Sequence, residues 1–386
     1  MTNTTDLAIK VGYKVPVIAL SLYAVASGYL MSIIPLMLSN YGIDANNASW
    51  LASVFYLGLL IGAIVIEPAV NHIGHRLALI ACLILLIATI VFLPLAPFAW
   101  VWLVTRFIAG IAVAGVFVIV ESWLLVGDED NRAKRLGLYM GSLYGGSAIG
   151  QLGIGFFGVQ GSIPFIMILS LLAMAVLVLL FAPASQPTTS HSTALPLKQL
   201  DKLNHTAIIG CVVSGLLLSA VYGLMPVELT HRNVSQSQLS TLMTLVILGG
   251  MAVQTLVPAL IKIVGRTPLM GLFSLLGVFA VGLMILNDAL HVLSIGIFLL
   301  GMAVFALYPI AINLGCDKLD ESQIVSATQV MLFCYSIGSV AGPVIANWFM
   351  SNAQGLMAYF LATMMTTAIY MLITSIRAKN HLASGE

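Results

Sequence analysis

The chain has 386 residues, of which 60% are hydrophobic and 8% charged, with a formal net charge of +1. Soluble domains carry about 25% charged residues, so this composition excludes an ordinary water-soluble protein. A net charge so close to zero also argues against a nucleic-acid partner.

Apolar runs of about twenty residues fill the chain, and this is the length that spans a bilayer as a helix. The runs are continuous rather than alternating, which favours helices over a β-barrel. The short polar segment 1–12 precedes the first run without the pattern of a cleaved signal peptide, so that run is retained as a spanning helix. We predict twelve spans, at 13–38, 49–70, 77–97, 100–125, 136–158, 162–182, 204–227, 238–261, 269–287, 292–315, 326–350 and 356–376.

The basic residues predict the orientation of these spans. With the N-terminus inside, all fifteen Lys and Arg residues except Arg106 and Arg232 fall on cytoplasmic segments. The positive-inside rule demands this asymmetry. We therefore expect a multi-pass protein of the cell inner membrane with both termini in the cytoplasm.

The longest polar stretch, 183–203, is rich in Pro, Ser and Thr and reads as a cytoplasmic linker. It divides the chain into an N-terminal six-helix bundle at 1–182 and a C-terminal six-helix bundle at 204–386. The bundles resemble each other weakly: the segments 107–113 and 298–304 share four residues at an offset of 191, which also places Tyr144 on Tyr335. The short basic turns 71–76 and 262–266 correspond as well, and two joined six-span halves are a known transporter layout.

Motifs for bound chemistry are missing from the sequence. The four cysteines form no CxxC or Cys/His spacing, so we expect no metal site. No phosphate-binding loop and no common hydrolase or kinase motif occurs, so we expect no cofactor and no enzyme activity. Energy for any transport would then come from a gradient rather than from ATP.

Several ordered motifs together resemble the major facilitator superfamily of secondary transporters, over nearly the whole chain. The turn 71–76 is similar to its motif between the second and third spans, and Arg106 with the glycines that follow is similar to its fourth-span motif. The chain resembles most closely an uncharacterised bacterial branch, the YcaD-like transporters. Its most specific stretches are Glu121-Ser122-Trp123 and the run GSVAGPV that begins at Gly338; the other stretches begin at Ile73, Asn131, Leu138, Val221, Leu248, Ala306 and Tyr335.

The resemblance implies an all-α membrane fold of two pseudo-symmetric six-helix bundles, and two departures from the superfamily pattern bear on function. Asn71 stands where the superfamily motif carries an acid, and Lys262 takes the equivalent place in the second half. In the superfamily this acid is thought to help lock the outward-facing state. Its absence from both halves puts that lock in doubt for this chain. Gln151 replaces the proline of the antiporter motif, which weakens an assignment of drug/proton exchange from motifs.

Arg106 is the foremost candidate for a functional residue, because a charge within a span costs about 2.5–3.5 kcal/mol to insert. It could order an anionic or polar substrate or help to move a proton. Alternatively, it could reach outward to the interface or pin two helices through carbonyl groups. We favour a functional role.

Glu121 and Glu67 are the acidic candidates. Glu121 lies near the inner end of the same span as Arg106, about 22 Å away at 1.5 Å per residue, so the two cannot pair. It could be a proton site, although a brace to Arg76, Arg132 or Arg135 is slightly favoured. Glu67, next to Pro68, could titrate in a cavity or could lie at the membrane interface.

A second group of polar side chains within spans could line a substrate cavity, although each could equally bond helix to helix. This group comprises Tyr144, Gln151, Tyr222, Gln254, Tyr308, Asn313 and Tyr335. A third group could gate the cavity or permit helix motion: Asn71, Gly74, Arg76, Asp317, Gly338, Gly342 and Pro343. For these glycines close helix packing is the simpler interpretation, and a hinge is compatible with it.

We therefore expect a monomeric secondary transporter that moves a small organic molecule by alternating access, coupled to protons. A proton-driven drug or metabolite exporter is the nearest alternative, and a channel is the alternative from another class. An intramembrane enzyme would need clustered His, Asp or Glu inside spans, which this chain lacks.

Overall fold

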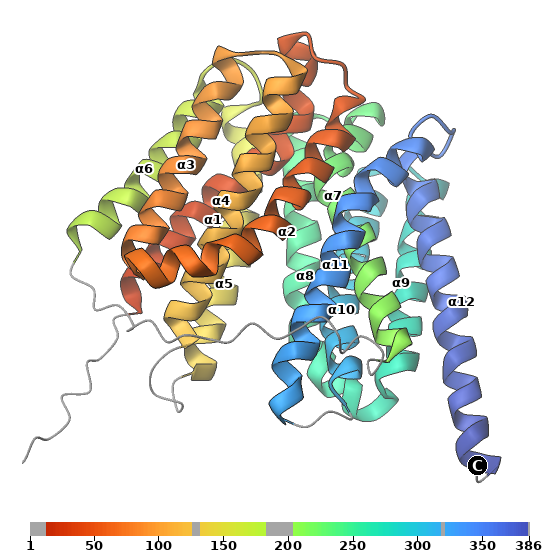
Figure 1. The fold of residues 1–386 in the computed structure, drawn as a ribbon. Coiled ribbons are helices and arrows are strands. Elements are labelled where there is room, and N and C mark those ends of the chain that lie inside the picture. The colour runs from red at the N-terminus through yellow and green to blue at the C-terminus, as the bar shows by residue number, and fades with distance from the viewer. Residues whose placement is uncertain (1–12, 126–131, 183–203, 318–320, 385–386) are drawn as a thin grey trace, which may run out of the picture.

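The computed structural model describes residues 13–125, 132–182, 204–317 and 321–384. Twelve long helices occupy these segments (Figure 1), so the predicted twelve-helix architecture is confirmed. They are α1 Lys14–Met37, α2 Asn47–Ile73, α3 His75–Leu95, α4 Ala99–Leu125, α5 Arg132–Phe157, α6 Ile163–Phe181, α7 His205–His231, α8 Gln236–Val264, α9 Arg266–Leu286, α10 Leu290–Gly315, α11 Glu321–Phe349 and α12 Gly355–Ser384. A short 3₁₀ turn, η1 Leu38–Tyr41, extends α1.

Eleven of the helices in the described segments are long and apolar enough to cross a membrane by themselves. The remaining one, α5, is 26 residues long but interrupts its apolar residues with many glycines and several polar side chains. Such a helix is suited to close packing among neighbours rather than to contact with lipid. We accordingly find α5 packed against both α1 and α8.

The helices pair in the same way in each half of the chain. In the first half, α1 packs on α5, α2 on α4, and α3 on α4. In the second half, α7 packs on α11, α8 on α10, and α9 on α10. Each pairing recurs six helices later, so the two bundles are related by the predicted pseudo-symmetry.

The matching turns between the second and third helices of each half have the same backbone conformation. Gly74 has φ 79° and ψ 162°, and Gly265 has φ 85° and ψ 162°. Side chains are strained at such positive φ values, which explains why both turns are built on glycine. The internal repeat seen in the sequence is therefore a structural repeat.

Glycines also fix the closest helix contacts of the repeat. A Cβ atom at Gly58 would overlap the carbonyl of Phe107, and one at Gly249 would overlap the carbonyl of Phe298. These pairs, α2 with α4 and α8 with α10, keep the offset of 191 residues.

The contact of α5 with α1 corresponds to that of α11 with α7. The offset is 192 residues between α5 and α11, while α1 and α7 keep the offset of 191. Gly146 approaches the carbonyl of Ser21, and Gly338 approaches that of Val212. One turn further along, Gly150 lies against α1 and Gly342 lies against α7. The sequence alignment that paired Tyr144 with Tyr335 is therefore one residue out between α5 and α11.

The helix ends are named here by the predicted orientation. The inner ends are those at the Gly74 and Gly265 turns, and the outer ends are opposite. Hydrogen bonds between the two bundles are found toward the outer ends, where the Ser240 hydroxyl donates to the Gln151 carbonyl at 3.0 Å and the Thr244 hydroxyl to the Ala148 carbonyl at 3.3 Å. In Figure 1 the ribbons of the two bundles diverge from there toward the inner ends.

The proposed linker, 183–203, lies outside the described residues, so the boundaries assigned to the two bundles remain predictions. Helix ends differ from the predicted spans by a few residues, and α12 continues to Ser384, eight residues beyond its predicted end. Polar residues at that end, beginning with Arg377, allow the helix to extend past the apolar part of the segment.

Candidate functional site

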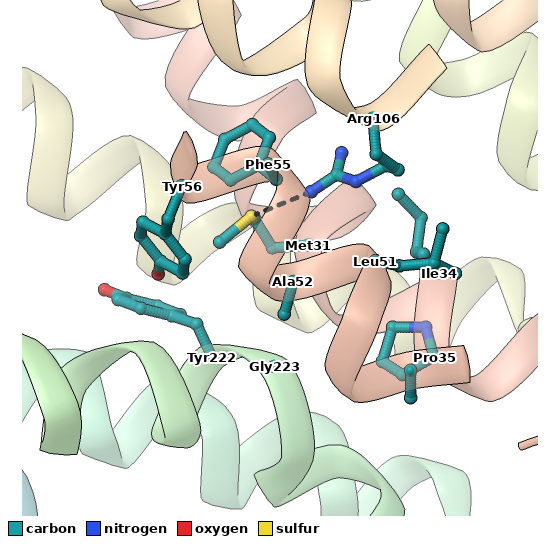
Figure 2. Close-up of a pocket in the computed structure, with 11 residues that line it drawn as sticks. Met31, Ile34, Pro35, Leu51, Ala52, Phe55, Tyr56, Arg106, Tyr222 and Gly223 are labelled. Atoms are coloured by element: carbon teal, nitrogen blue, oxygen red, sulfur yellow. Dashed lines mark hydrogen bonds between the residues drawn. The ribbon is translucent and has the colours of Figure 1, made fainter. Parts of the chain in front are cut away.

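A buried pocket lies between the two bundles, with Arg106 in its wall (Figure 2). The first bundle supplies most of the lining from α1, α2 and α4, and the second supplies Tyr222 and Gly223 from α7. The space open to a water-sized molecule is about 20 Å³, which is room for about one water. The pocket is therefore nearly closed in this conformation.

Arg106 extends from α4, two turns from its outer end, and only 5% of it is exposed. Its guanidinium carbon lies 4.2 Å from the centre of the Phe55 ring, and one terminal nitrogen approaches the Met31 sulfur at 3.8 Å. Its Nε is buried without a hydrogen-bond partner. A thioether is a weak acceptor, so the main partner of the guanidinium charge is the face of the Phe55 ring.

Two other arginines, Arg76 and Arg232, are satisfied in a conventional way. Arg76 donates to the carbonyls of Leu180 at 3.0 Å and Ala182 at 2.9 Å, at the carboxyl end of α6. Arg232 pairs with Glu228 and Asp288, each at 2.9 Å. Compared with these, Arg106 has a buried charge and no carboxylate within ion-pair distance in the described part of the chain.

The structural repeat shows that an arginine is not needed at this place in the fold. The position equivalent to Arg106 in the second bundle is Ile297, which is fully buried. Phe55, on which Arg106 stacks, corresponds to Val246, and the glycines beside them make equivalent contacts: Gly110 with the Phe55 carbonyl, and Gly301 with that of Val246. The same packing is thus built once with apolar side chains and once around a cation.

Tyrosines from both bundles gather beside this charge. In Figure 2 the rings of Tyr56 and Tyr222 face each other across the pocket, with their hydroxyl groups close together. The rings of Tyr308 and Tyr335 pack at a tilt of 53°, with ring centres 4.8 Å apart. No hydrogen bond between described residues uses the hydroxyl of Tyr56 or Tyr222.

Phe305 of α10 connects this group to the first bundle. Its ring makes edge contacts with Tyr144 at 5.7 Å and Tyr222 at 6.3 Å. The structure therefore brings these predicted residues into one aromatic group.

Glu121 lies on the last turns of α4 and is exposed. It lies within electrostatic range of the hydroxyl groups of Tyr139 and, across the bundle boundary, Tyr308. Glu67 is half-buried near the inner end of α2 and does not line the Arg106 pocket.

The three predicted amides lie apart from the pocket. Gln151 is fully buried, where it accepts from the Ser32 hydroxyl at 2.7 Å. Gln254 donates to the Phe305 carbonyl at 3.2 Å and so ties α8 to α10. Asn313 is exposed and donates to the Pro309 carbonyl of its own helix at 2.9 Å. All three make the helix-to-helix or local bonds that were the alternative to substrate contact.

The predicted gate residues occupy helix ends and close contacts. Asp317 pairs with Arg266 at 2.8 Å across the inner ends of α10 and α9. Gly342 lies against α7 and Pro343 is within α11. Asn71 is in the last turns of α2, and its side chain lies outside the described part of the structure.

Sequence reasoning did not single out Met31, Phe55, Tyr56 and Phe305. Three of them are apolar residues in apolar helices, and only the rotation of the helix decides that they face the pocket. Tyr56 carried a usable signal, because a phenol within a span seeks a polar partner.

Fold and site together define a multi-span carrier of the secondary-transporter type. The model of the Major Facilitator Superfamily matches residues 17–343, and the chain belongs to this superfamily. It is similar to an uncharacterised MFS-type transporter of Yersinia pestis, with 31% identity over 92% of this chain and 93% of the relative. It is also similar to the uncharacterised MFS-type transporter YcaD of Escherichia fergusonii, with 27% identity over 93% and 94%.

Solved structures of transporters share the fold. The crystal structure of the nucleoside transporter NupG aligns with a TM-score of 0.75 at 11% identity, over 94% of this chain and 96% of that one. The D-xylose–proton symporter aligns with a TM-score of 0.70 at 13% identity, over 92% and 96%. These identities are low, so the likeness concerns the fold alone. The sequence-based family and fold are confirmed, as is the expectation of a transporter rather than an enzyme.

Proposed function

We propose that this protein is a monomeric, proton-coupled secondary transporter of the bacterial inner membrane that moves a small organic molecule by alternating access. Both termini would lie in the cytoplasm, as the distribution of basic residues predicts. The observation that carries the proposal is the buried pocket between the bundles, in which Arg106 has no anionic partner among the described residues. Charges inside membrane proteins are rare and mark transport pathways by default.

The packing of the bundles supports a rocking motion around this pocket. Ser240 and Thr244 hold the second bundle to α5 toward the outer ends through two hydrogen bonds. Both bonds join a hydroxyl to a carbonyl and can be exchanged for water when the bundles separate. Paired bundles that rock about a midplane site are the usual device of such carriers.

Proton coupling rests on Arg106, Glu121 and Glu67. Glu121 lies within electrostatic range of Tyr308 in the second bundle, so its protonation would change the electrostatics of the bundle boundary. One proton moved through 100 mV provides about 2.3 kcal/mol, which supports roughly fifty-fold accumulation. One or two protons would therefore suffice for ordinary transport.

The test uses purified protein in liposomes loaded with a pH-sensitive dye. Small organic solutes are added outside, and solute-dependent proton movement is recorded for the wild type and for Arg106→Met, Glu121→Gln and Glu67→Gln. Lys14→Gln, at the exposed start of α1, is the matched control. We expect solute-dependent proton movement in the wild type and in the control, and its loss in at least one of the other three.

Proton dependence that is unaltered in all three variants would remove the coupling proposal. Counterflow separates a carrier from a channel, since only a carrier exchanges labelled for unlabelled solute in a saturable way. Efflux driven by an inward proton gradient would favour the exporter. Linear, unsaturable flux would favour the channel.

A further inference from the structure

The pocket beside Arg106 has the chemistry of a binding site for one class of solute. We infer that it binds a small monovalent organic anion, a carboxylate with an aromatic or other flat apolar body. The carboxylate would lie on the Arg106 guanidinium, and the apolar body would lie between the aromatic rings from the two bundles. This inference rests on the proposed transport function and names its substrate class.

The first step is the unused bonding capacity of Arg106. A guanidinium has five N–H donors in a planar fork and stays charged in proteins. Among the described residues its one acceptor is the Met31 sulfur, and its Nε has no partner there. Stacking on Phe55 offsets only part of the cost of burying an unpaired charge. A carboxylate fits the fork with two parallel hydrogen bonds.

The second step is the number of charges. Among the described residues that line the pocket, Arg106 is the one cation and none is acidic. A single negative charge on the solute would therefore neutralise the site, whereas a dianion would bring a surplus charge into the membrane. A neutral solute would leave the positive charge of the guanidinium unpaired.

The third step is the nature of the walls. Phe55 covers one face of the guanidinium, and the rings of Tyr56 and Tyr222 face each other from opposite bundles. Aromatic faces pack well against flat apolar groups. The unused hydroxyls of the two tyrosines are donors that can serve a second oxygen of the solute. Because Tyr222 belongs to the other bundle, a solute held by both would couple binding to the separation of the bundles.

The fourth step excludes a purely structural role for Arg106. The equivalent site in the second bundle packs with Ile297 and Val246, both fully buried. The fold thus tolerates an apolar side chain there, and the arginine adds a charge that packing does not require. Buried ion pairs are often replaced by apolar residues without loss of stability. We expect Arg106→Met to fold and to melt no lower than the wild type.

The experiment is a thermal melt of the purified protein with matched acid and amide pairs. Benzoate is compared with benzamide, phenylacetate with phenylacetamide, and formate and chloride serve as anions without an apolar body. We expect the two aromatic acids to raise the melting temperature in a saturable way, while the amides, formate and chloride leave it unchanged at equal ionic strength. Arg106→Met should weaken the response to the acids at least ten-fold.

Further variants keep the inference testable if Arg106→Met does not fold. Arg106→Lys retains the charge without the fork and should bind the acids more weakly than the wild type. Phe55→Leu should weaken binding of the aromatic acids and leave the preference for acid over amide intact. Lys14→Gln, at the exposed start of α1, is the control and should respond as the wild type does.

Three outcomes would overturn the inference: equal stabilisation by the amides, equal stabilisation by formate or chloride, or no stabilisation by either aromatic acid. Counterflow separates this result from the transport proposal. Acids that bind but are not exchanged would refute transport and leave the site standing. Exchange of a neutral solute that persists in Arg106→Met would refute the site and leave transport standing.

Discussion

The Glu228 carboxylate at the outer end of α7 accepts a hydrogen bond from the backbone N–H of Leu356, at 3.0 Å, in the first turn of α12. The same carboxylate accepts from Arg232 at 2.9 Å, and Arg232 also donates to the Met284 carbonyl at the end of α9. A carboxylate at a helix amino end and a cation at a carboxyl end both suit the helix dipoles. This outer clasp, Glu228 with Arg232, joins three helices of the second bundle.

Removing Arg232 should destabilise the second bundle strongly. Glu228 is 5% exposed, so Arg232→Ala would leave a buried charge without its cation, at a cost of about 3–5 kcal/mol. Asp288, whose side chain is 75% exposed, is the control, and Asp288→Asn should cost less than about 1 kcal/mol. Thermal melts in detergent measure both. Equal melting temperatures for the two variants would contradict a stabilising role of the outer clasp.

Two glycines should respond to alanine in opposite directions. A Cβ atom at Gly338 would overlap the Val212 carbonyl of α7, whereas one at Gly141 would have no atom within 4 Å. Gly338→Ala should therefore separate α11 from α7 and lower the melting temperature. Gly141→Ala should raise it slightly, because alanine favours a helix by up to about 1 kcal/mol. The close packing of α11 on α7 would be refuted if Gly338→Ala melted at or above the wild-type temperature.

A disulfide across the outer ends should stop transport reversibly. The Cβ position of Gly155 lies 3.4 Å from the Cβ of Ser240 in the other bundle, close to the separation of about 3.5–4.5 Å found in disulfides. Gly155→Cys with Ser240→Cys, in a background without the four native cysteines, should cross-link and lose counterflow. A reductant should restore it, and each single variant should be unaffected by oxidation. Full counterflow in the cross-linked protein would show that the outer ends need not separate.

Labelling in intact cells should report the orientation. We expect Asn233→Cys, after α7, to react with a membrane-impermeant maleimide, because this turn is predicted to lie outside. Lys262→Cys, at the end of α8, should react only after the membrane is opened. Both positions are exposed, so a difference in reactivity reflects the side of the membrane. The reverse pattern would invert the predicted topology.

Much of the fold could be predicted from the sequence, because apolar runs and basic turns report directly on lipid and on the two membrane surfaces. Gly74 and Gly265 revealed the repeat, since a positive φ leaves little choice of residue. Arg106 was found for a similar reason: a charge in an apolar helix is conspicuous. The surroundings of Arg106 were not predictable, because Phe55 is one apolar residue among many until the rotation of α2 is known.

The same limit explains the predictions that the structure places away from the pocket. Asn313 and Gln254 looked like cavity residues because they are polar within spans. Polar side chains in helices also donate hydrogen bonds to nearby carbonyls, and both Asn313 and Gln254 do so in this structure. The outer clasp was overlooked because Glu228 and Arg232 lie at a helix end, where charges are ordinary.

The central claim, that the two bundles rock about the Arg106 pocket, is tested most directly by distances between paired spin labels in liposomes. One pair joins the outer ends at Asn46 and Asn233, and the other joins the inner ends at His72 and Lys262; all four residues are exposed. The distances are measured at mildly acidic and mildly basic pH, with and without an aromatic carboxylate. We predict that any change of condition that lengthens the outer distance shortens the inner distance. If each pair keeps one distance in every condition, or if both pairs change in the same direction, the protein does not work by alternating access.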